Sequence, residues 1–154
     1  MNHFKERCHQ CKIPDVDTSA IKLYELNNWD VIQKFIKGEG NLAIVSSNHF
    51  TIMAKIAKTV IAYNMEKMLR FYSMSFLTQE LVSKVDYSDI DVICIPEIYG
   101  NFHYMKKESM SAILSNMLMK NKQLILGSDS TADIKEVFGT IWHTIDNTFE
   151  VVKD

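Results

Sequence analysis

A chain of 154 residues is long enough for one domain that buries its own hydrophobic core. A net charge of −2 argues against a strongly basic nucleic-acid-binding protein, and 47% hydrophobic with 23% charged residues is typical of a soluble globular domain. No apolar run approaches the roughly 18–20 residues that span a bilayer, residues 1–7 lack an apolar signal region, and the cysteine count of three is odd. We therefore expect a cytoplasmic protein that has no disulfide framework and does not contact a membrane.

The first 14 residues are polar, contain Pro14 and show no apolar period. We interpret residues 1–14 as an N-terminal tail or docking segment, ahead of an α/β domain over residues 15–154. Because this tail supplies no strand, we expect its deletion to leave the core folded and to weaken binding to a partner. Cys8 and Cys11 have the spacing of metal ligands, but a structural zinc site needs four ligands and the chain holds no second pair of this kind. A zinc site completed by another chain is left open.

Beyond this tail, apolar runs of strand length alternate with stretches of helical period. The predicted strands are residues 42–45, 70–74, 90–95, 123–126 and 148–152. The predicted helices are a short one that ends at Lys37, followed by residues 52–61, 75–82, 110–118 and 134–145. Continuous apolar strands connected by helices indicate a mainly parallel sheet that is covered on both faces. The predicted fold is therefore a three-layer α/β fold with a five-stranded sheet.

The segment between the first predicted strand and the following helix lacks the features of a phosphate-binding loop. In parallel α/β sheets, ligands bind beyond the carboxyl ends of the strands, and a phosphate loop there needs glycines, a lysine and a serine or threonine. No glycine occurs between Gly40 and Gly100. The third predicted strand is followed by Pro96, where a nucleotide hydrolase would place its metal-binding carboxylate. We therefore expect no enzyme activity, no cofactor and no tight binding of ATP.

Residues 71–81, 90–98 and 122–129 resemble the ATPase core of bacterial replicative helicase loaders and initiators, the AAA+ clade of DnaA, DnaC, DnaI and IstB. The resemblance spans about residues 15–154, and residues 8–14 also resemble the segment ahead of the core in some phage-type loaders. It implies the strand order fifth, first, fourth, third, second. The chain ends after its fifth predicted strand, without the helical lid of the initiator branch, so loaders are the better comparison.

Carried onto this sequence, the family pattern implies a degenerate, vestigial nucleotide site. The phosphate loop falls on residues 46–54, the metal-binding carboxylate on Pro96, the water-polarising carboxylate on Glu97 and the sensor near Asp129. The inter-subunit arginine falls within residues 138–147, which contain no Arg or Lys. A glutamate without metal, phosphate cradle or arginine cannot support phosphoryl transfer, which depends on positioned charge. The residues of the predicted vestigial site are Ser46, Ser47, Asn48, His49, Thr51, Pro96, Glu97 and Asp129.

Aromatic and basic residues follow the third predicted strand and suggest a second hypothesis. Tyr99, Phe102 and Tyr104 precede Lys106 and Lys107. Aromatic rings with neighbouring lysines can hold single-stranded DNA by stacking and charge, and the same aromatic residues can anchor a protein interface. The simpler alternative is a solvated helix face with aromatic residues folded onto the core.

The principal hypothesis is a catalytically inactive relative of helicase loaders that acts through protein contacts in DNA replication. Its predicted partner is a replication protein, either a helicase or an active loader, which it would assist or inhibit. A single-stranded DNA-binding module and a divergent ATPase are the alternatives. Salt-dependent binding to an oligonucleotide would favour the first alternative, and ATP turnover would favour the second.

Overall fold

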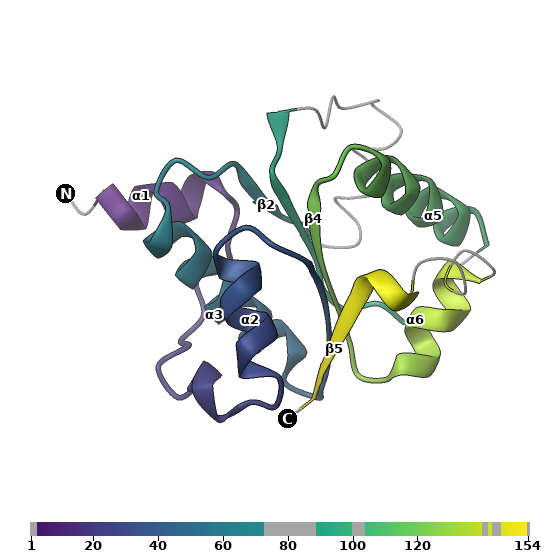
Figure 1. The fold of residues 1–154 in the computed structure, drawn as a ribbon, viewed down its shortest axis with the longest axis horizontal. Helices are drawn as coiled ribbons and strands as arrows, with labels where there is room; N and C mark the ends of the chain where they lie inside the picture. Colours follow the sequence, from purple (N-terminus) through teal and green to yellow (C-terminus); the bar gives the residue numbers. More distant parts are fainter. Residues whose placement is uncertain (1–2, 73–88, 100–103, 140–141, 143–145, 154) are drawn as a thin grey trace.

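The computed structural model describes residues 3–72, 89–99, 104–139, 142 and 146–153. In it, one five-stranded sheet separates two layers of helices, which confirms the predicted three-layer α/β fold (Figure 1). No helix in these ranges is long and apolar enough to cross a membrane.

All strand pairs of the sheet are parallel. The strands are β1 (Asn41–Val45), β2 (Leu69–Phe71), β3 (Val92–Ile95), β4 (Gln123–Ser128) and β5 (Phe149–Lys153). Their order is β2-β3-β4-β1-β5, which is the order that the resemblance implied. Every residue of β3 and β4 is buried, because both faces of the sheet are covered by helices.

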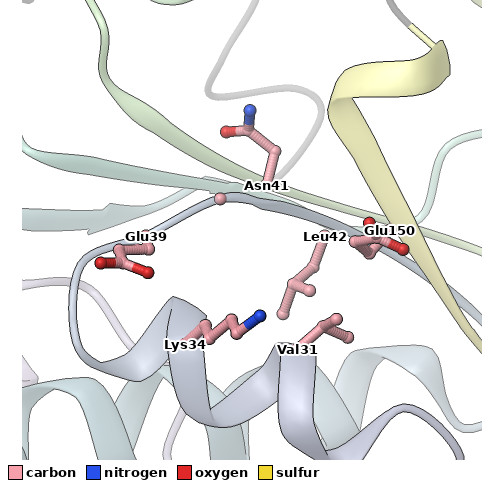
Figure 2. A pocket seen from close by; sticks show the side chains of 7 residues that line it. Val31, Lys34, Glu39, Asn41, Leu42 and Glu150 are labelled. Carbon is pink, nitrogen blue, oxygen red and sulfur yellow. The ribbon is translucent and has the colours of Figure 1, made fainter.

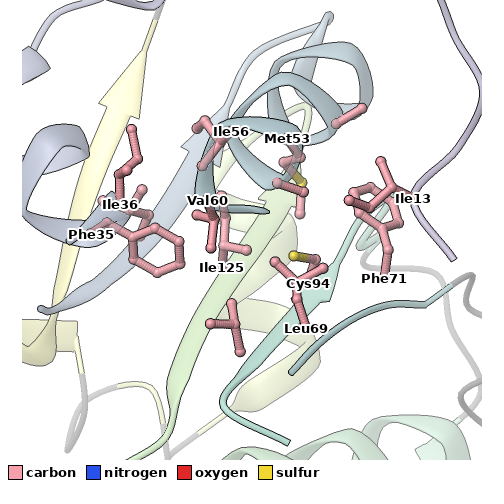
Figure 3. Close-up of a cluster of buried hydrophobic side chains, with 14 of the residues drawn as sticks. Ile13, Phe35, Ile36, Met53, Ile56, Val60, Leu69, Phe71, Cys94 and Ile125 are labelled. Atoms are coloured by element: carbon pink, nitrogen blue, oxygen red, sulfur yellow. The ribbon is translucent and has the colours of Figure 1, made fainter. Parts of the chain in front are cut away.

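The helices form the two outer layers. They are α1 (His3–Gln10), α2 (Trp29–Ile36), α3 (His49–Tyr63), α5 (Tyr104–Met119) and α6 (Thr131–Phe138), with short 3-10 turns η1 (Leu23–Glu25) and η3 (Asp146–Thr148). Helices α1, α2 and α3 lie on one face of the sheet, and α5 and α6 lie on the other (Figure 1). Each face has its own hydrophobic cluster, and in the first of these Met53, Ile56 and Val60 of α3 pack with Ile125 and Cys94 of the sheet (Figure 3).

Several predicted boundaries differ from those of the structure. Strand β4 continues to Ser128, two residues beyond its predicted end. Helix α6 ends at Phe138, because Gly139 follows it with a φ of 56°, a conformation that stops a helix. Most of the remainder of the helix predicted to reach residue 145 lies outside the described residues. The predicted helix over residues 75–82 lies outside the described residues, as does the end of the strand predicted to reach residue 74.

The N-terminal segment, for which the sequence predicted no helix or strand, contains helix α1. The helix ends in a Schellman motif, in which the Lys12 N–H donates to the His9 carbonyl and the Ile13 N–H donates to the Cys8 carbonyl. Lys12 adopts the left-handed φ of 62° that this motif needs. The motif brings Ile13 back against Cys8, and both side chains are buried with Cys11 in the cluster that contains α3.

Hydrogen bonds attach this segment to the rest of the domain. The Arg7 guanidinium donates to the carbonyls of Met65 and Lys67, each at 2.7 Å. The Phe71 N–H of strand β2 donates to the Cys11 carbonyl at 2.9 Å. Because these bonds and the buried side chains belong to the core, we no longer expect the core to fold unchanged without residues 1–14.

Candidate functional site

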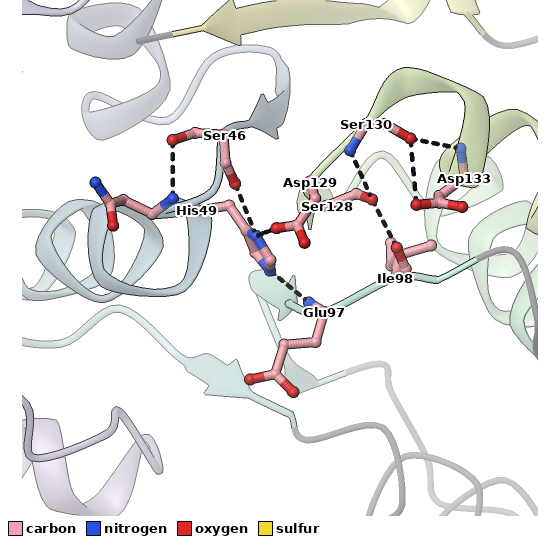
Figure 4. Close-up of polar contacts among 9 residues, drawn as sticks. Ser46, His49, Glu97, Ile98, Ser128, Asp129, Ser130 and Asp133 are labelled. Carbon is pink, nitrogen blue, oxygen red and sulfur yellow. Dashed lines mark hydrogen bonds and ion pairs between the residues drawn. The ribbon is translucent and has the colours of Figure 1, made fainter.

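The residues that follow strands β1, β3 and β4 meet at the carboxyl edge of the sheet (Figure 4). His49 begins helix α3 after the short turn that leaves β1, Glu97 follows β3, and Asp129 follows β4. This edge is where α/β sheets of this kind bind ligands. The structure brings together four of the sequence-predicted residues, Ser46, His49, Glu97 and Asp129, and it arranges them around His49, which was not predicted.

The imidazole of His49 lies at the centre of this group and is only 3% exposed. Its Nε2 accepts a hydrogen bond from the Glu97 N–H at 2.9 Å. Its Nδ1 lies 3.0 Å from the Ser46 carbonyl oxygen and 3.2 Å from Asp129 Oδ1. Because a backbone N–H can only donate, Nε2 must be unprotonated, and the proton of the neutral ring belongs on Nδ1, facing two acceptors. Both ring nitrogens are therefore satisfied within the protein.

Gly127 of β4 makes room for this ring. A Cβ atom added at Gly127 would overlap Met53 Sδ and lie 2.8 Å from His49 Cδ2. Met53 is fully buried, so neither neighbour has open space to move into. Gly127 lies just beyond the predicted strand of residues 123–126 and belongs to β4 in the structure. A glycine that continues an apolar strand often marks a close approach of another group, and this signal could have indicated its role.

Ser128 connects the ends of three strands. Its hydroxyl donates to the Ile98 carbonyl at 2.6 Å and is completely buried, and its own carbonyl accepts from the Ser46 N–H at 3.0 Å. The Ile98 N–H in turn donates to the Gly127 carbonyl at 2.9 Å. Glu97, held between this bond and the one to His49, has a left-handed φ of 58°, which is uncommon for a residue with a side chain. Hydrogen bonds on both sides therefore fix a backbone conformation that Glu97 would otherwise disfavour.

The turn from β1 to α3 differs from a phosphate-binding loop. The Asn48 N–H donates to Ser46 Oγ at 3.0 Å, and the His49 N–H donates to the Ser46 carbonyl at 3.1 Å. A phosphate loop presents such N–H groups to the ligand, whereas both are used inside this turn. Among the other predicted site residues, Ser47 and Asn48 are exposed, Thr51 is half-buried on α3, and Pro96 is buried after β3.

The solvent side of this edge is acidic. The carboxylates of Glu97 and Asp129 are exposed, and their negative charges act on the hydroxyl group of Tyr99. The pKa of the Tyr99 hydroxyl is raised, first by partial loss of hydration and then by the negative charges of Asp129, Glu97 and Asp133. Three carboxylates therefore place negative charge near Tyr99.

The remaining residues of the predicted DNA or partner contact are only partly described. Lys107 lies on α5 with its ammonium 3.4 Å from Glu136 Oε1 on α6, so its charge has a partner. Tyr104 and Lys106 belong to the same helix, but their side chains, like all of Phe102, lie outside the described part of the chain.

Cys8 and Cys11, which have metal-ligand spacing, face the hydrophobic cluster. The pKa of the Cys8 thiol is raised by burial and by the neighbouring Cys11, which favours the protonated form and disfavours the thiolate that binds metals. In the ranges that the structure describes, no three His, Cys, Asp or Glu side chains are grouped as a metal site would require.

A shallow hollow of about 240 Å³ lies at the opposite, amino end of the sheet (Figure 2). Its lining residues are Val31, Lys34, Glu39, Gly40, Asn41, Leu42 and Glu150. Small-molecule sites usually measure about 300–1,000 Å³, so the hollow is smaller than a typical ligand pocket. It is also remote from the strand ends at which such sheets bind ligands.

Comparison with known proteins identifies the fold. No protein-family model matches the chain, and no curated protein matches it. Several solved structures do match the chain. DnaI aligns with a TM-score of 0.66 over 92% of this chain and 89% of its own. The replication initiator DnaA bound to AMPPCP and single-stranded DNA aligns with 0.66 over 91% of this chain, and AMPPCP-bound DnaA from Aquifex aeolicus with 0.61 over 82%.

The chain has the fold of these replication proteins. It spans about half the length of the two DnaA chains, 50% and 45% respectively, and the identity is 14% in all three alignments. The shared features are therefore the parallel sheet and its covering helices.

Proposed function

We propose that this protein is a catalytically inactive AAA+-like protein that acts in DNA replication through contacts with a replicative helicase or an active helicase loader. The shared fold with DnaA and DnaI supports a replication role. Such a protein can keep the shape of an ATPase domain while it assists or inhibits an active relative. The partner in this proposal is a protein, and neither a nucleotide nor a metal takes part.

The observation that carries the proposal is the buried His49. Its buried ring lies between the first turn of α3 and the residues that follow β3 and β4, at the sheet edge where such folds bind ligands. Pro96 supplies no carboxylate for a magnesium ion. Arg7, one of only two arginines in the chain, is bound to two backbone carbonyls near α1. Phosphoryl transfer relies on positioned positive charge, and these positions supply none.

We place the partner contact at the carboxyl edge, around Tyr99. This tyrosine is 36% exposed and stands beside a backbone segment held by hydrogen bonds from His49 and Ser128. Tyrosine is enriched among the residues that dominate protein interfaces, because it buries a large area at a small cost in side-chain entropy. The acidic surroundings of Tyr99 favour a protein partner over single-stranded DNA.

The experiment is affinity purification of the tagged protein from its native host. We expect a replicative helicase or helicase loader to copurify, and we expect Tyr99→Ala to lower the affinity about tenfold or more, as truncation of an anchoring aromatic does. Tyr63→Ala is the matched control, because Tyr63 is a 60% exposed tyrosine at the end of α3, at the opposite, amino end of the sheet.

Two results would contradict the proposal. If no replication protein copurifies, the proposed partner, a replicative helicase or helicase loader, is contradicted. Binding of a labelled oligonucleotide that weakens steeply with salt and is lost in Tyr99→Ala would instead assign this edge to single-stranded DNA.

A further inference from the structure

His49 makes contacts that link three separate segments at the carboxyl edge. One ring nitrogen reaches the Ser46 carbonyl of the β1–α3 turn and the Asp129 carboxylate after β4, and the other reaches the Glu97 N–H after β3. Ligands bound at this edge of an α/β sheet make contacts of the same kind, because they lie where the loops after several strands converge. The ring therefore connects the loops from within the chain.

We propose that the His49 imidazole is an internal ligand, which holds the loops after β1, β3 and β4 in one arrangement without any bound molecule. The ring is buried, both nitrogens are hydrogen-bonded, and the space beside it is shaped by Gly127 and Met53 to fit it closely. A molecule that took the place of the ring would have to displace it and break its hydrogen bonds. In this proposal the loops at the carboxyl edge keep one arrangement.

The backbone at Glu97 shows what this contact does. Its left-handed conformation is stabilised where its N–H donates to His49 Nε2. Without that acceptor, the Glu97 N–H would have to donate to water. The left-handed conformation would then lose one of the hydrogen bonds that stabilise it. His49 is therefore a positioning residue for the exposed Glu97 side chain and for the segment that leads to Tyr99.

This inference goes beyond the proposed function, since it holds whichever partner binds the edge. Its test uses two variants that keep different parts of the ring. In His49→Gln, the side-chain oxygen can reach the position of Nε2 and accept from the Glu97 N–H. In His49→Asn, the shorter amide can replace only Nδ1 and its contact with Ser46. Hydrogen exchange of individual backbone amides, followed by NMR, reports on the bond itself.

We expect the Glu97 amide to exchange about tenfold faster in the Asn variant than in the wild type, whereas the Gln variant stays within a few-fold. Amides of the sheet core, such as that of Ile125, should change much less, and ATP with magnesium should leave the wild-type rates unaltered. Unchanged protection of Glu97 in the Asn variant would overturn the inference. A uniform rise across the core amides would also overturn it, because it would assign His49 a general packing role.

A second measurement covers the case in which these variants fold poorly. His49→Ala opens a space of the shape of the lost ring, and added imidazole should restore both stability and Glu97 protection. Pyrrole is the matched control, since it has the same ring size but no acceptor nitrogen. Equal rescue by imidazole and pyrrole would show that only the volume of the ring matters, and would contradict the inference.

Discussion

Deletion of residues 1–14 should remove a large share of the stability of the domain. The deletion takes away the buried side chains of Cys8, Cys11 and Ile13 and exposes the surface of α3 and β2 that they cover. Burying one large apolar side chain such as that of Ile13 contributes about 1.5–3 kcal/mol, and each of the smaller cysteine side chains contributes less. The combined loss should therefore be about 4–6 kcal/mol, against a typical domain stability of about 5–15 kcal/mol. The hydrogen bonds that Arg7 donates to the Met65 and Lys67 carbonyls are lost as well.

Urea denaturation followed by circular dichroism measures this effect as a shift of the midpoint. His9→Ala is the control, because His9 is exposed on α1 and its truncation should leave the midpoint unchanged. A truncated chain that unfolds at the wild-type midpoint would show that the packing of α1 contributes nothing. The docking role that the sequence suggested for this segment competes with the contact placed around Tyr99, and exposed substitutions such as Lys5→Glu separate the two. Weaker partner binding at a constant midpoint would assign the contact to α1 instead.

Gly127→Ala should destabilise the domain by about 2–3 kcal/mol, as overpacking of a closely fitted core does. The added methyl group would overlap Met53 Sδ and press on the ring of His49, and both side chains are buried. Movement of the ring would break its hydrogen bond with Glu97, so the loss should exceed that of a simple clash with a flexible side chain. Thermal or urea denaturation of the variant gives the size of the effect.

The double variant Gly127→Ala/Met53→Ala identifies the cause. Met53→Ala alone should cost about 2–5 kcal/mol through the cavity that it leaves. Because the new methyl at position 127 would fill part of that cavity, the double variant should be clearly less destabilised than the sum of the two single variants. Additive losses would show that the methyl group does not meet Met53, and would contradict the packing described around His49.

The general fold could be predicted because it depends on local patterns. The apolar runs at residues 42–45 and 123–126 and the helical period of residues 52–61 are visible in the sequence, and each is a strand or helix of the structure. The order of the strands is set by contacts between distant segments and came only from the resemblance to AAA+ proteins. Periodicity alone could not supply it.

Helix α1 was not predicted because two residues of its apolar side, Cys8 and Cys11, were interpreted as metal ligands. Phe4, Cys8 and Cys11 recur at intervals of four and three residues, which is the spacing of one helix face. The cysteines were instead considered as a pair of metal ligands. Cysteine is among the residues most often buried, and in this segment it packs as a small apolar side chain.

The sequence placed the candidate site at the strand ends, but the contacts within it could not be predicted. The Glu97 N–H and the His49 ring are separated by 48 residues in the sequence, and Ser128 and Ile98 by 30. No local pattern encodes such bonds. A histidine in a short polar turn is usually exposed, and only the glycine within β4 indicated that something would approach this strand closely.

Isothermal titration calorimetry with ATP and magnesium, combined with a phosphate-release assay, tests the central claim most directly. We predict no heat of binding and no release of phosphate, because His49 occupies the edge of the sheet and the N–H groups of Asn48 and His49 are already bonded to Ser46. Glu97→Gln serves as a control for contaminating ATPases, since any genuine turnover at this edge should fall in that variant. Micromolar affinity for ATP together with turnover that Glu97→Gln abolishes would contradict the account.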